Sequence, residues 1–439
     1  MNKNVRMIGM IMLTAILIAG CGNNGGSKNG NKGNEGATAS QQSDKKVNLT
    51  WVGWSGSDKP SDAIIGGMID NWNKTNPNTT AAWLGWPWDQ ALQQIMVRNT
   101  SKQDMDVGQS EIGWLKALHE ADAIVELSDL VGQDWLNANF EPSALGVGQI
   151  DGKQYGIPWT MSATSMVYNP ALLEAAGVTK APETIEEFEA ALQQLKAYDK
   201  EIIPYGALTK SASASNDIQV WLWMFGGGVF DENGEVIINN EAGLRTMNWY
   251  KKLYDQGFIK MDISRNDARQ LFTQGKMGFY EDAILAKGIV LDGGVSEDDL
   301  LKRIAPIPRP VLNAGDTPRD KMWGHLLVVF KNSPNQQEAA DFIKHIVGKE
   351  SATSYFVQGG LLPTMKEVIA SEEVQNDPLA QQWLEITKTS RMGDTEAYSE
   401  KAALDNIIVE EFQAMLLNAK EPQKALDDAA SRIKSTLKK

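Results

Sequence analysis

Hydrophobic and polar positions change their period several times along this chain, and each change marks a predicted element. Residues 47–51 alternate between apolar and polar side chains and predict a strand, whereas the apolar residues of 64–72 fall on one helical face. A second strand at 79–84 and a second helix through Val97, with Asp89 as its expected N-cap, repeat the order. The patterned part of the chain therefore begins as strand, helix, strand and helix.

A third strand is expected at 105–108, followed by a helix that begins at 109–111. Strands that alternate with helices are typical of a parallel, doubly wound α/β sheet, in which ligands bind outside the carboxyl ends of the strands. Six residues of this region follow strand ends and carry aromatic or hydrogen-bonding side chains. They are Trp54, Ser55, Trp88, Asp89, Gln109 and Glu111.

The stretch 151–169 joins this region to the rest of the chain and predicts an extended crossing. Asp151-Gly152 is a turn dipeptide, and Gly156 together with Pro158 excludes a regular helix. Trp159 lies within the crossing, where it is either an ordinary core side chain or a ligand contact.

Beyond the crossing the alternation of helices and strands starts again. Thr184 and Glu187 have the spacing of a capping box at the start of a helix, and a strand is expected after that helix. A tryptophan-rich helical segment then ends in three glycines, and this segment holds Asn216, Trp221 and Trp223.

Later segments are expected to carry the chain back across the hinge. The segment 272–282 predicts a returning strand that delivers Glu281 and Asp282 to its end. Trp323 opens a further strand, and the helix at 336–347 is the candidate for a third crossing.

The amino terminus has the pattern of a secretion signal. Lys3 and Arg6 precede fourteen uncharged and mostly apolar residues, too few to span a membrane stably, and the run ends in LIAGC at Cys21. This ending resembles the lipobox of bacterial lipoproteins, so Cys21 is the expected lipid attachment site and 1–20 the signal peptide. The alternatives are an uncleaved anchor helix and a buried free cysteine. Residues 21–46 hold almost nothing apolar and are expected to form a flexible tether.

Composition narrows the range of functions. A formal net charge of −14 and a pI near 4.9 argue against a nucleic-acid surface, which needs clustered Lys and Arg. The single cysteine excludes an intrachain disulfide and a cysteine-based metal cluster, and we expect neither a metal nor a cofactor. Fourteen Trp against three His suits ligand stacking as well as core filling.

Familiar catalytic motifs are absent from the sequence. It contains no HExxH and no phosphate loop, and the segment 53–57 reads GWSGS, with Ser where the last Gly of GxSxG should stand. The turn at 231–234 lacks the glycine spacing and the closing Glu of an EF-hand. A hydrolase with paired carboxylates remains compatible with fifty-six Asp and Glu, and a surface scaffold or adhesin is a third alternative.

Taken together, these features resemble the extracellular solute-binding proteins of family 1, the carbohydrate-capturing subunits of bacterial ABC importers. The resemblance spans the chain after the signal. It rests on the lipobox-like ending, on DGKQYGIPW followed by MVYNPALLEAAG, on GGGVFDENGEVIINN, on FTQGKMGFYED, and on VVFKNSPNQQEAADFIKHIV through LLPT.

The resemblance implies two α/β lobes joined by three crossings, the type II plan of periplasmic binding proteins, with the ligand held in the cleft. The first lobe would comprise 47–158 with 283–340, and the second 159–282 with 341–439. It also implies a permease and an ATPase as partners, a monomeric protein, and a location on the outer face of the cell membrane. A binding protein for a different polar solute is an alternative within the same plan.

Ligand residues in this family lie on strand-end loops and near the crossings. A sugar presents apolar C–H faces and a rim of hydroxyls, so aromatic rings and polar side chains at such positions are the candidates. The resemblance therefore implies the following ligand-binding residues: Trp54, Ser55, Trp88, Asp89, Gln109, Glu111, Trp159, Asn216, Trp221, Trp223, Glu281, Asp282 and Trp323.

Overall fold

The computed structural model describes residues 46–57, 61–210 and 212–438, apart from the side chain of Asp89. The predicted signal peptide, Cys21 and nearly all of the predicted tether lie outside the described residues. The described residues belong to one compact unit, Lys45–Lys439. No helix in the described ranges is long and apolar enough to cross a membrane.

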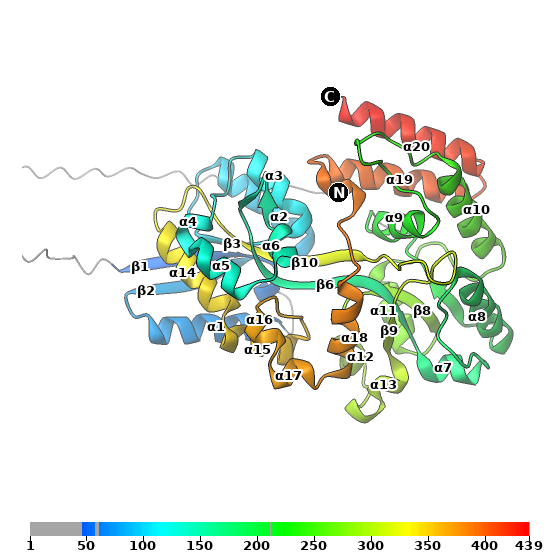
Figure 1. The fold of residues 1–439 in the computed structure, drawn as a ribbon, viewed down its shortest axis with the longest axis horizontal. Helices are drawn as coiled ribbons and strands as arrows, with labels where there is room; N and C mark the ends of the chain where they lie inside the picture. Colours follow the sequence, from blue (N-terminus) through cyan, green and yellow to red (C-terminus); the bar gives the residue numbers. More distant parts are fainter. Residues whose placement is uncertain (1–45, 58–60, 211, 439) are drawn as a thin grey trace, which may run out of the picture. The chain divides into compact units, whose positions relative to one another are not determined.

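One main sheet runs through this unit (Figure 1). Its strand order is β2 (Thr79–Gly85), β1 (Val47–Gly53), β3 (Val107–Glu111), β10 (Lys321–Val329), β6 (Ile157–Tyr168), β8 (Met277–Asp282) and β7 (Ile203–Gly206), and β9 (Ala305–Ile307) also pairs with β6. β1 is parallel to β2 and β3, and β7 is parallel to β8, whereas β10 and β6 pair antiparallel to their neighbours. The α/β class with parallel strand sets on both sides of a crossing is confirmed.

The predicted crossing is the single strand β6, which changes partners along its length. Residues 157–164 pair with β10, whereas 165–168 pair with β8 and β9. A small antiparallel pair, β4 (Gln149–Ile150) and β5 (Lys153–Gln154), precedes it, and its turn places Asp151 and Gly152 at positive φ. The turn and the extended crossing expected at 151–169 are therefore confirmed.

The first lobe is built on β1, β2 and β3, and buried apolar clusters lie on both faces of these strands. One cluster contains Trp51 and the other contains its neighbour Val52, because successive residues of a strand point to opposite faces. Its helices are α1 (Ser61–Thr75), α2 (Trp88–Thr100), α3 (Leu115–Glu120), α4 (Ser128–Val131), α5 (Gln133–Asn139), α6 (Pro142–Gly146), α14 (Gln336–Val347), α15 (Lys349–Gly359) and α16 (Lys366–Ile369), with the 3-10 turns η1 (Ser55–Ser57) and η2 (Ile112–Trp114).

The second lobe surrounds β7, β8 and β9 with a third buried cluster. Helix α8 begins where the sequence predicted, because the Thr184 side chain accepts from the Glu187 amide and Glu187 reaches back to the Thr184 amide. The helices of this lobe are α7 (Pro170–Ala175), α8 (Ile185–Tyr198), α9 (Ala214–Met224), α10 (Glu241–Asp255), α11 (Arg265–Thr273), α12 (Ala286–Asp292), α13 (Leu300–Arg303), α17 (Glu372–Gln375), α18 (Pro378–Thr387), α19 (Lys401–Leu416) and α20 (Pro422–Leu437), with η3 (Glu297–Asp299) and η4 (Asp394–Ala397).

Two local predictions in the first lobe were wrong. Strand β3 continues through Glu111 instead of giving way to a helix, because the backbone of 109–111 pairs with β10 in the middle of the sheet. Helix α2 begins at Trp88 with Pro87 as its N-cap residue, so Asp89 lies inside the first turn and does not cap it.

Two predicted crossings were also misplaced. Strand β8, at the end of 272–282, pairs only with β6 and β7 among the described strands, so it does not reach the first lobe. Strand β10 pairs with both β3 and β6 and is the strand that carries the chain back between the lobes. Helix α14 packs into the same buried cluster as β1, so it stays in the first lobe. Figure 1 shows β6 and β10 side by side between the two groups of helices.

The lobe boundaries expected from the sequence stay a prediction. The buried clusters bear on two of them: α14 and α15 contribute mainly to the cluster around β1, whereas α12 and β9 contribute to the cluster around β8.

Candidate functional site

Three tryptophans gather where β1, β2 and β3 reach their carboxyl ends. The Trp54 ring lies 4.9 Å from the Trp114 ring at a steep angle, and the Trp88 ring lies 6.4 Å from Trp114, nearly parallel to it. Trp88 is 48% exposed, an unusual position for so large an apolar side chain. This edge of the sheet therefore presents an aromatic surface.

The row of aromatic rings continues along one face of β10. Lys321, Trp323 and His325 alternate with residues of the opposite face, as side chains two apart on a strand do. The His325 ring lies 4.8 Å from the Trp323 ring and 4.9 Å from the Trp54 ring. The aromatic surface thus reaches from the strand ends of the first lobe to Trp323 near the start of β10.

Gln109 and Ser55 hold this surface in place from beneath. The Gln109 Oε1 atom accepts from the Trp54 and Ser55 amides at 3.2 and 3.0 Å, and its Nε2 donates to Ser55 Oγ at 2.7 Å and to His325 Nδ1 at 3.1 Å. Burial lowers the pKa of His325 to about 3, which keeps the ring neutral and able to accept this bond. Gln109 and Ser55 are buried and bonded within the protein, so they position the rings.

Glu111 ends β3 beside the exposed tryptophan. It accepts from Trp88 Nε1 at 2.8 Å, and its pKa is raised by burial, an effect that the Lys321 ammonium and the Trp88 hydrogen bond oppose. The charges of Glu396 and Lys401 also act on this pKa. A carboxylate of the first lobe therefore faces charged side chains that come from the hinge and from the far end of the sequence.

Those charged side chains form ion pairs with low exposure. Lys321 Nζ lies 2.5 Å from Glu396 Oε1, with side chains 9% and 5% exposed, and Lys401 Nζ lies 2.5 Å from Asp405 Oδ2. A Cβ atom on Gly113, within η2, would lie 3.4 Å from Glu396. The turn η4, which carries Glu396, therefore lies directly against η2 of the first lobe.

Trp223 and Asn216 lie on α9, near the segment that carries η4. Trp223 Nε1 donates to Asp394 at 3.1 Å, and the Arg391 guanidinium lies 4.1 Å from the centre of the Trp223 ring. Asn216 is half-buried, and its Oδ1 has no hydrogen-bond partner in the described part of the chain. Trp223 is buried in the second-lobe cluster, and both residues belong to α9 of that lobe.

Three predicted residues lie in the second-lobe core instead. Trp221 is fully buried and donates to Tyr205 Oη at 2.8 Å, Glu281 pairs with Arg309 at 2.5 Å, and Asp282 makes two bonds of 2.8 Å to Arg269. The structure brings Trp221 and Glu281 together, with 3.4 Å between Trp221 Nε1 and Glu281 Oε1, whereas Asp282 is bound by Arg269.

Trp159 is buried like the core residues, but its ring lies near His325 of the aromatic surface. It is 2% exposed and stacks on Tyr355, with ring centres 4.5 Å apart and planes 10° apart. The register shift between β6 and β10 leaves Trp159 as the extra residue of a bulge, beside Pro158, which cannot donate to the ladder. Asp89, the remaining candidate, has its side chain outside the described residues.

Sequence reasoning did not select four residues that the structure places at this surface: Trp114, Lys321, His325 and Glu396. The signal for Trp114 was present, since it follows Glu111 closely, but its helical neighbours read as core. His325 stands two residues after Trp323, and strand alternation would have placed them together. Glu396 has no local pattern, because it reaches the site only through the tertiary fold.

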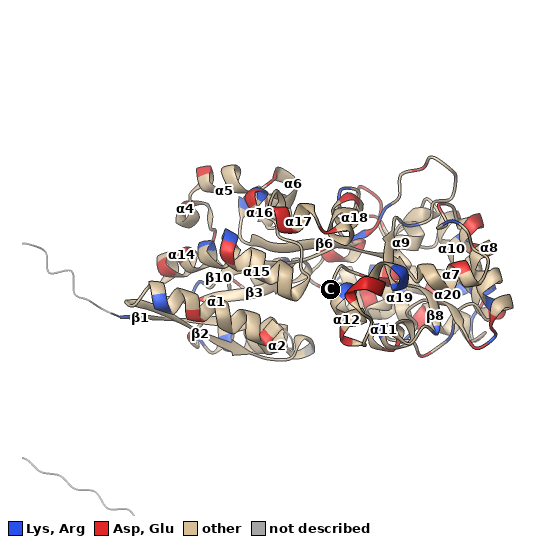
Figure 2. Ribbon diagram, turned by 90° about the horizontal axis from the view of Figure 1, so that it is seen from below, with Lys and Arg blue, Asp and Glu red and all other residues tan. Residues whose placement is uncertain are grey.

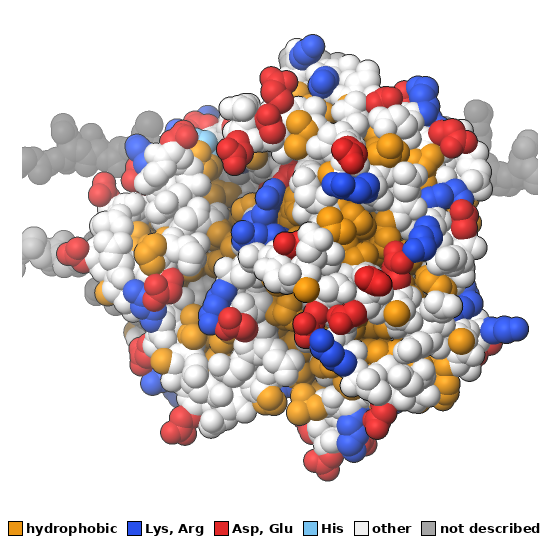
Figure 3. All heavy atoms as spheres, turned by 45° about the vertical axis from the view of Figure 1, so that its right-hand side comes forward, with side chains coloured by type: hydrophobic (Ala, Val, Ile, Leu, Met, Phe, Trp, Pro, Cys, Tyr) orange, Lys and Arg blue, Asp and Glu red, His pale blue; other side chains and the backbone are white. Residues whose placement is uncertain are grey.

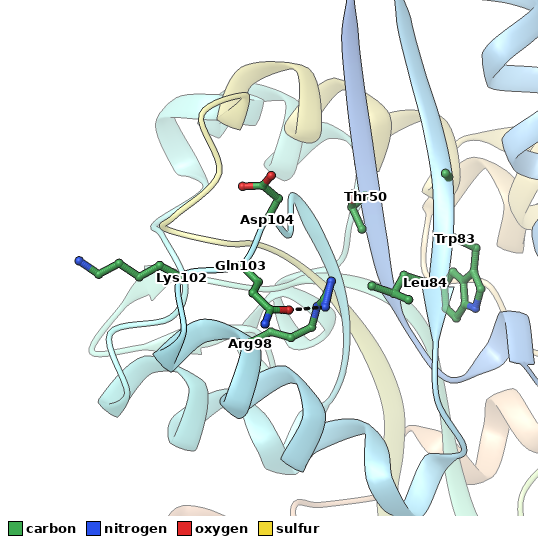
Figure 4. A pocket seen from close by; sticks show the side chains of 8 residues that line it. Thr50, Trp83, Leu84, Arg98, Lys102, Gln103 and Asp104 are labelled. Carbon is green, nitrogen blue, oxygen red and sulfur yellow. Dashed lines mark hydrogen bonds between the residues drawn. The ribbon is translucent and has the colours of Figure 1, made fainter. Parts of the chain in front are cut away.

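A separate hollow of about 550 Å³ lies beside β1 and β2 (Figure 4). Its lining comprises Thr50, Ala82, Trp83, Leu84, Arg98, Lys102, Gln103 and Asp104, and it contains none of the predicted ligand residues. Arg98 donates to Gln103 across it at 2.5 Å. This hollow is therefore distinct from the aromatic surface.

Charged side chains of both signs are interspersed on the described surface. Figure 2 shows Lys and Arg distributed among Asp and Glu over many helices, and the face in Figure 3 has apolar patches between charges of both signs. Neither view shows the clustered basic surface that phosphate backbones require. In the described ranges, no group of three or more His, Cys, Asp or Glu is arranged to hold a metal ion.

Comparison with known proteins identifies relatives over most of the chain. The profile of the family described as bacterial extracellular solute-binding protein matches residues 67–382. A Brucella abortus (strain 2308) protein named only as a binding protein is 25% identical over 371 residues, which cover 83% of this chain and 87% of that protein. The arabinooligosaccharide-binding protein of Bacillus subtilis (strain 168) is 22% identical over 84% of this chain and 88% of its own length.

A solved structure has the same fold. The GacH receptor of Streptomyces glaucescens, crystallised unliganded and in complex with acarbose, matches with a TM-score of 0.80 at 19% identity and covers 90% of this chain and 99% of its own. This likeness establishes the fold, and the family profile covers well over half of the chain. The chain therefore belongs to the bacterial extracellular solute-binding proteins.

Proposed function

We propose that this chain is the substrate-binding subunit of an ABC importer, which captures a sugar or oligosaccharide between its lobes and delivers it to a membrane permease. Relatives named for arabinooligosaccharide and maltotriose binding, and the fold shared with an acarbose-binding receptor, support the choice of a carbohydrate. A permease and an ATPase are the partners that such a subunit serves, and we propose that it acts as a monomer.

The aromatic surface is the observation that carries the proposal. Trp88, Trp114 and Trp323 are partly exposed and offer flat apolar faces, Trp54 packs against Trp114 behind them, and Glu111 offers a hydrogen-bond acceptor beside Trp88. Asn216 Oδ1, on α9 of the second lobe, is a further acceptor without a partner among the described residues. A sugar ring needs both, because its C–H faces stack on indole while its hydroxyls need polar partners. Among the predicted ligand residues, we therefore propose direct contacts for Trp54, Trp88, Glu111, Asn216, Trp223 and Trp323.

We propose that the bound sugar is released unchanged. The relatives compared above are named as binding proteins or a receptor, and no enzyme is among them. The rival is a hydrolase that would use Glu111 and a second carboxylate as acid and base. Incubation of the protein with a bound oligosaccharide, followed by chromatography, separates the two: intact sugar supports a receptor and shorter products support a hydrolase.

We further propose that Cys21 anchors the protein to the outer face of the cell membrane. The support is the LIAGC ending of the apolar run, together with the extracellular setting of the family. Metabolic labelling with a fatty acid analogue should mark the wild-type protein and not Cys21→Ser.

A thermal-shift screen tests the central proposal. A ligand that binds only the folded state raises the melting temperature, since it adds RT ln(1 + [L]/Kd) to the free energy of unfolding. We expect at least one neutral mono- or oligosaccharide to stabilise the purified protein and X-ray scattering with that sugar to show compaction as the lobes close. A carbohydrate panel without any stabilising member would refute the assignment to sugars.

A further inference from the structure

The strongest unassigned feature is the group of charged side chains at the inner end of the aromatic surface. Lys321 lies on the same face of β10 as Trp323 and His325, and its ammonium acts on the pKa of Glu111 at the end of β3. Its partner Glu396 comes from η4, more than seventy residues later in the chain. The pair therefore lies where the first-lobe surface meets the second lobe.

Glu396 is held rigidly although its own pairing is incomplete. The neighbouring Thr395 amide donates to Gln219 Oε1 at 3.2 Å, and Gln219 in turn donates to Thr395 Oγ1 at 3.3 Å. Lys321 engages only Oε1 of Glu396, and the buried Oε2 atom has no hydrogen-bond partner among the described residues. A carboxylate oxygen buried without a donor is costly, so a hydroxyl that donates to Glu396 Oε2 would relieve this cost.

The local balance of charge is acidic. Each nearby cation has a carboxylate partner: Lys321 pairs with Glu396, Lys401 with Asp405, and Arg391 with Asp394. Glu111, by contrast, has a hydrogen bond from Trp88 and no ion pair within the described ranges. Burial raises the pKa of Glu111, the Lys321 ammonium opposes this rise, and the nearby Glu396 carboxylate adds to it, so the carboxylates of Glu111 and Glu396 act on one another.

We propose that Lys321 and Glu396 contact the solute and that, with Glu111, they restrict it to sugars without a carboxylate or phosphate group. This inference rests on the proposed sugar-binding function and narrows its substrate class. The Glu396 Oε2 atom accepts from one sugar hydroxyl, while a free proton of the Lys321 ammonium is donated to a neighbouring hydroxyl oxygen. An anionic sugar at this position would approach the carboxylates of Glu111 and Glu396. Each nearby cation already has a carboxylate partner and so compensates less for the added charge.

The test compares sugars that differ only in charge. Glucose and galactose, each as the monosaccharide and the 1,4-linked disaccharide, are matched with glucuronate and galacturonate in the same forms. Calorimetry on the purified wild-type protein should give, for the best neutral member, an affinity at least about ten-fold higher than for its uronate, the effect of one unfavourable charge contact. This comparison needs no variant, so it does not depend on how a mutant folds.

Glu396→Gln then tests the residues themselves, because it keeps the shape and removes the charge. The variant should bind the neutral sugar about ten-fold more weakly, and its preference over the uronate should shrink or reverse as Lys321 loses its partner. Glu400→Gln, an exposed glutamate at the start of α19, is the matched control and should behave as wild type.

The outcomes separate the two proposals. The inference is overturned if the wild-type protein binds the uronate as tightly as the neutral sugar. It is also overturned if Glu396→Gln and Glu400→Gln prefer the neutral sugar to the same degree. Either result leaves the sugar-binding function standing. If no member of either series binds and no other sugar of the thermal-shift panel stabilises the protein, the proposed function itself is overturned.

Discussion

Trp88 and Trp221 place the same side chain in opposite settings. Trp88 is 48% exposed and donates its N–H to Glu111, whereas Trp221 is fully buried, donates to Tyr205 and lies beneath the Arg309 guanidinium at 5.0 Å. Around Trp221, the charges of Glu281 and Arg309 are paired inside the second lobe. Around Trp88, the Glu111 carboxylate instead faces Lys321, Glu396 and Lys401, which come from other segments of the chain.

The comparison teaches that residue type alone does not mark a ligand site. Tryptophan beside a carboxylate at a strand end describes both regions. What differs is where the hydrogen-bonding capacity is used: within the lobe around Trp221, and at an open surface around Trp88. Mutations in the second-lobe core should therefore change stability, and mutations at the aromatic surface should change binding.

The largest expected effect is at Trp221. Trp221→Ala should lower the free energy of unfolding by about 3 to 5 kcal/mol, because it opens a cavity among Phe188, Tyr205 and Trp249. Urea denaturation measures the loss. The affinity of the remaining folded protein for its sugar should be unchanged, and a ten-fold loss of affinity would move Trp221 into the site.

Trp159 should combine both effects. Trp159→Ala should lower the free energy of unfolding by about 3 kcal/mol through the lost stack on Tyr355. Although Trp159 is not among the proposed direct contacts, its ring lies 6.2 Å from that of His325, so its loss should disturb the aromatic surface and weaken sugar binding by about 1.5 to 3 kcal/mol. Trp72→Ala is the control, since Trp72 is buried in the same cluster on α1, away from the aromatic surface. Equal affinities for the two variants would assign Trp159 to the core alone.

The two regions should also respond to pH with opposite signs. Burial raises the pKa of Asp320, a partner of Arg309, to about 6, and burial lowers the pKa of His325 to about 3. Folded Asp320 keeps a proton that the unfolded chain loses above about pH 4, so its contribution to stability is lost as pH rises towards 6. Folded His325 stays neutral, so its contribution is present above about pH 6.5 and is lost as pH falls towards 3.

Single substitutions should separate these opposing slopes. Between pH 4 and 6.5, Asp320→Asn removes a contribution that falls with pH, so the free energy of unfolding should rise with pH more steeply than in wild type. His325→Gln removes a contribution that rises with pH, so the free energy of unfolding should rise less steeply than in wild type, or fall. Each substitution should change the difference between the two ends of the interval by about 1 to 3 kcal/mol. Urea titrations at three pH values give the slopes. If both variants keep the wild-type slope, burial of these groups does not control the pH dependence.

The smallest effect on stability is expected at Trp88. Trp88→Ala should leave the free energy of unfolding within about 0.5 kcal/mol of wild type, because half of the side chain is already in water. Sugar binding should weaken by about 1.5 kcal/mol through the lost stacking face. Val97→Ala, on the exposed side of the same helix, is the control in calorimetry, and identical affinities for the two variants would count against stacking at Trp88.

Local pattern was enough for much of the fold. Strand β1, helix α1 and the capping box at Thr184 were predicted because their signals lie within a few residues of one another. The helix expected at 109–111 failed because pairing with β10, more than two hundred residues away, extends β3 there. The return crossing was assigned to β8 instead of β10 for the same reason, since strand order is decided by tertiary pairing.

The candidate site was only partly accessible from sequence. Trp54, Trp88 and Glu111 were predicted because they follow or end strands, and the structure places them near one another, although their contact with a ligand stays a prediction. Trp221, Glu281 and Asp282 share that signature, but Tyr205, Arg309 and Arg269 bind them internally, and those partners are distant in sequence. Glu396 was missed because no neighbouring residue indicates that η4 lies against η2.

The change of partners along β6 has a mechanical consequence. Lys321 pairs with Thr164, and the next residue of β6, Ser165, already pairs with Asp282 of the second lobe. In any rotation of one lobe about these strands, displacement grows with distance from the axis, so Lys321 at the pivot moves little while Trp88 at the rim sweeps a longer arc. The inner contacts with a solute would then be preformed in the open protein, and the rim would be the part assembled as the lobes come together.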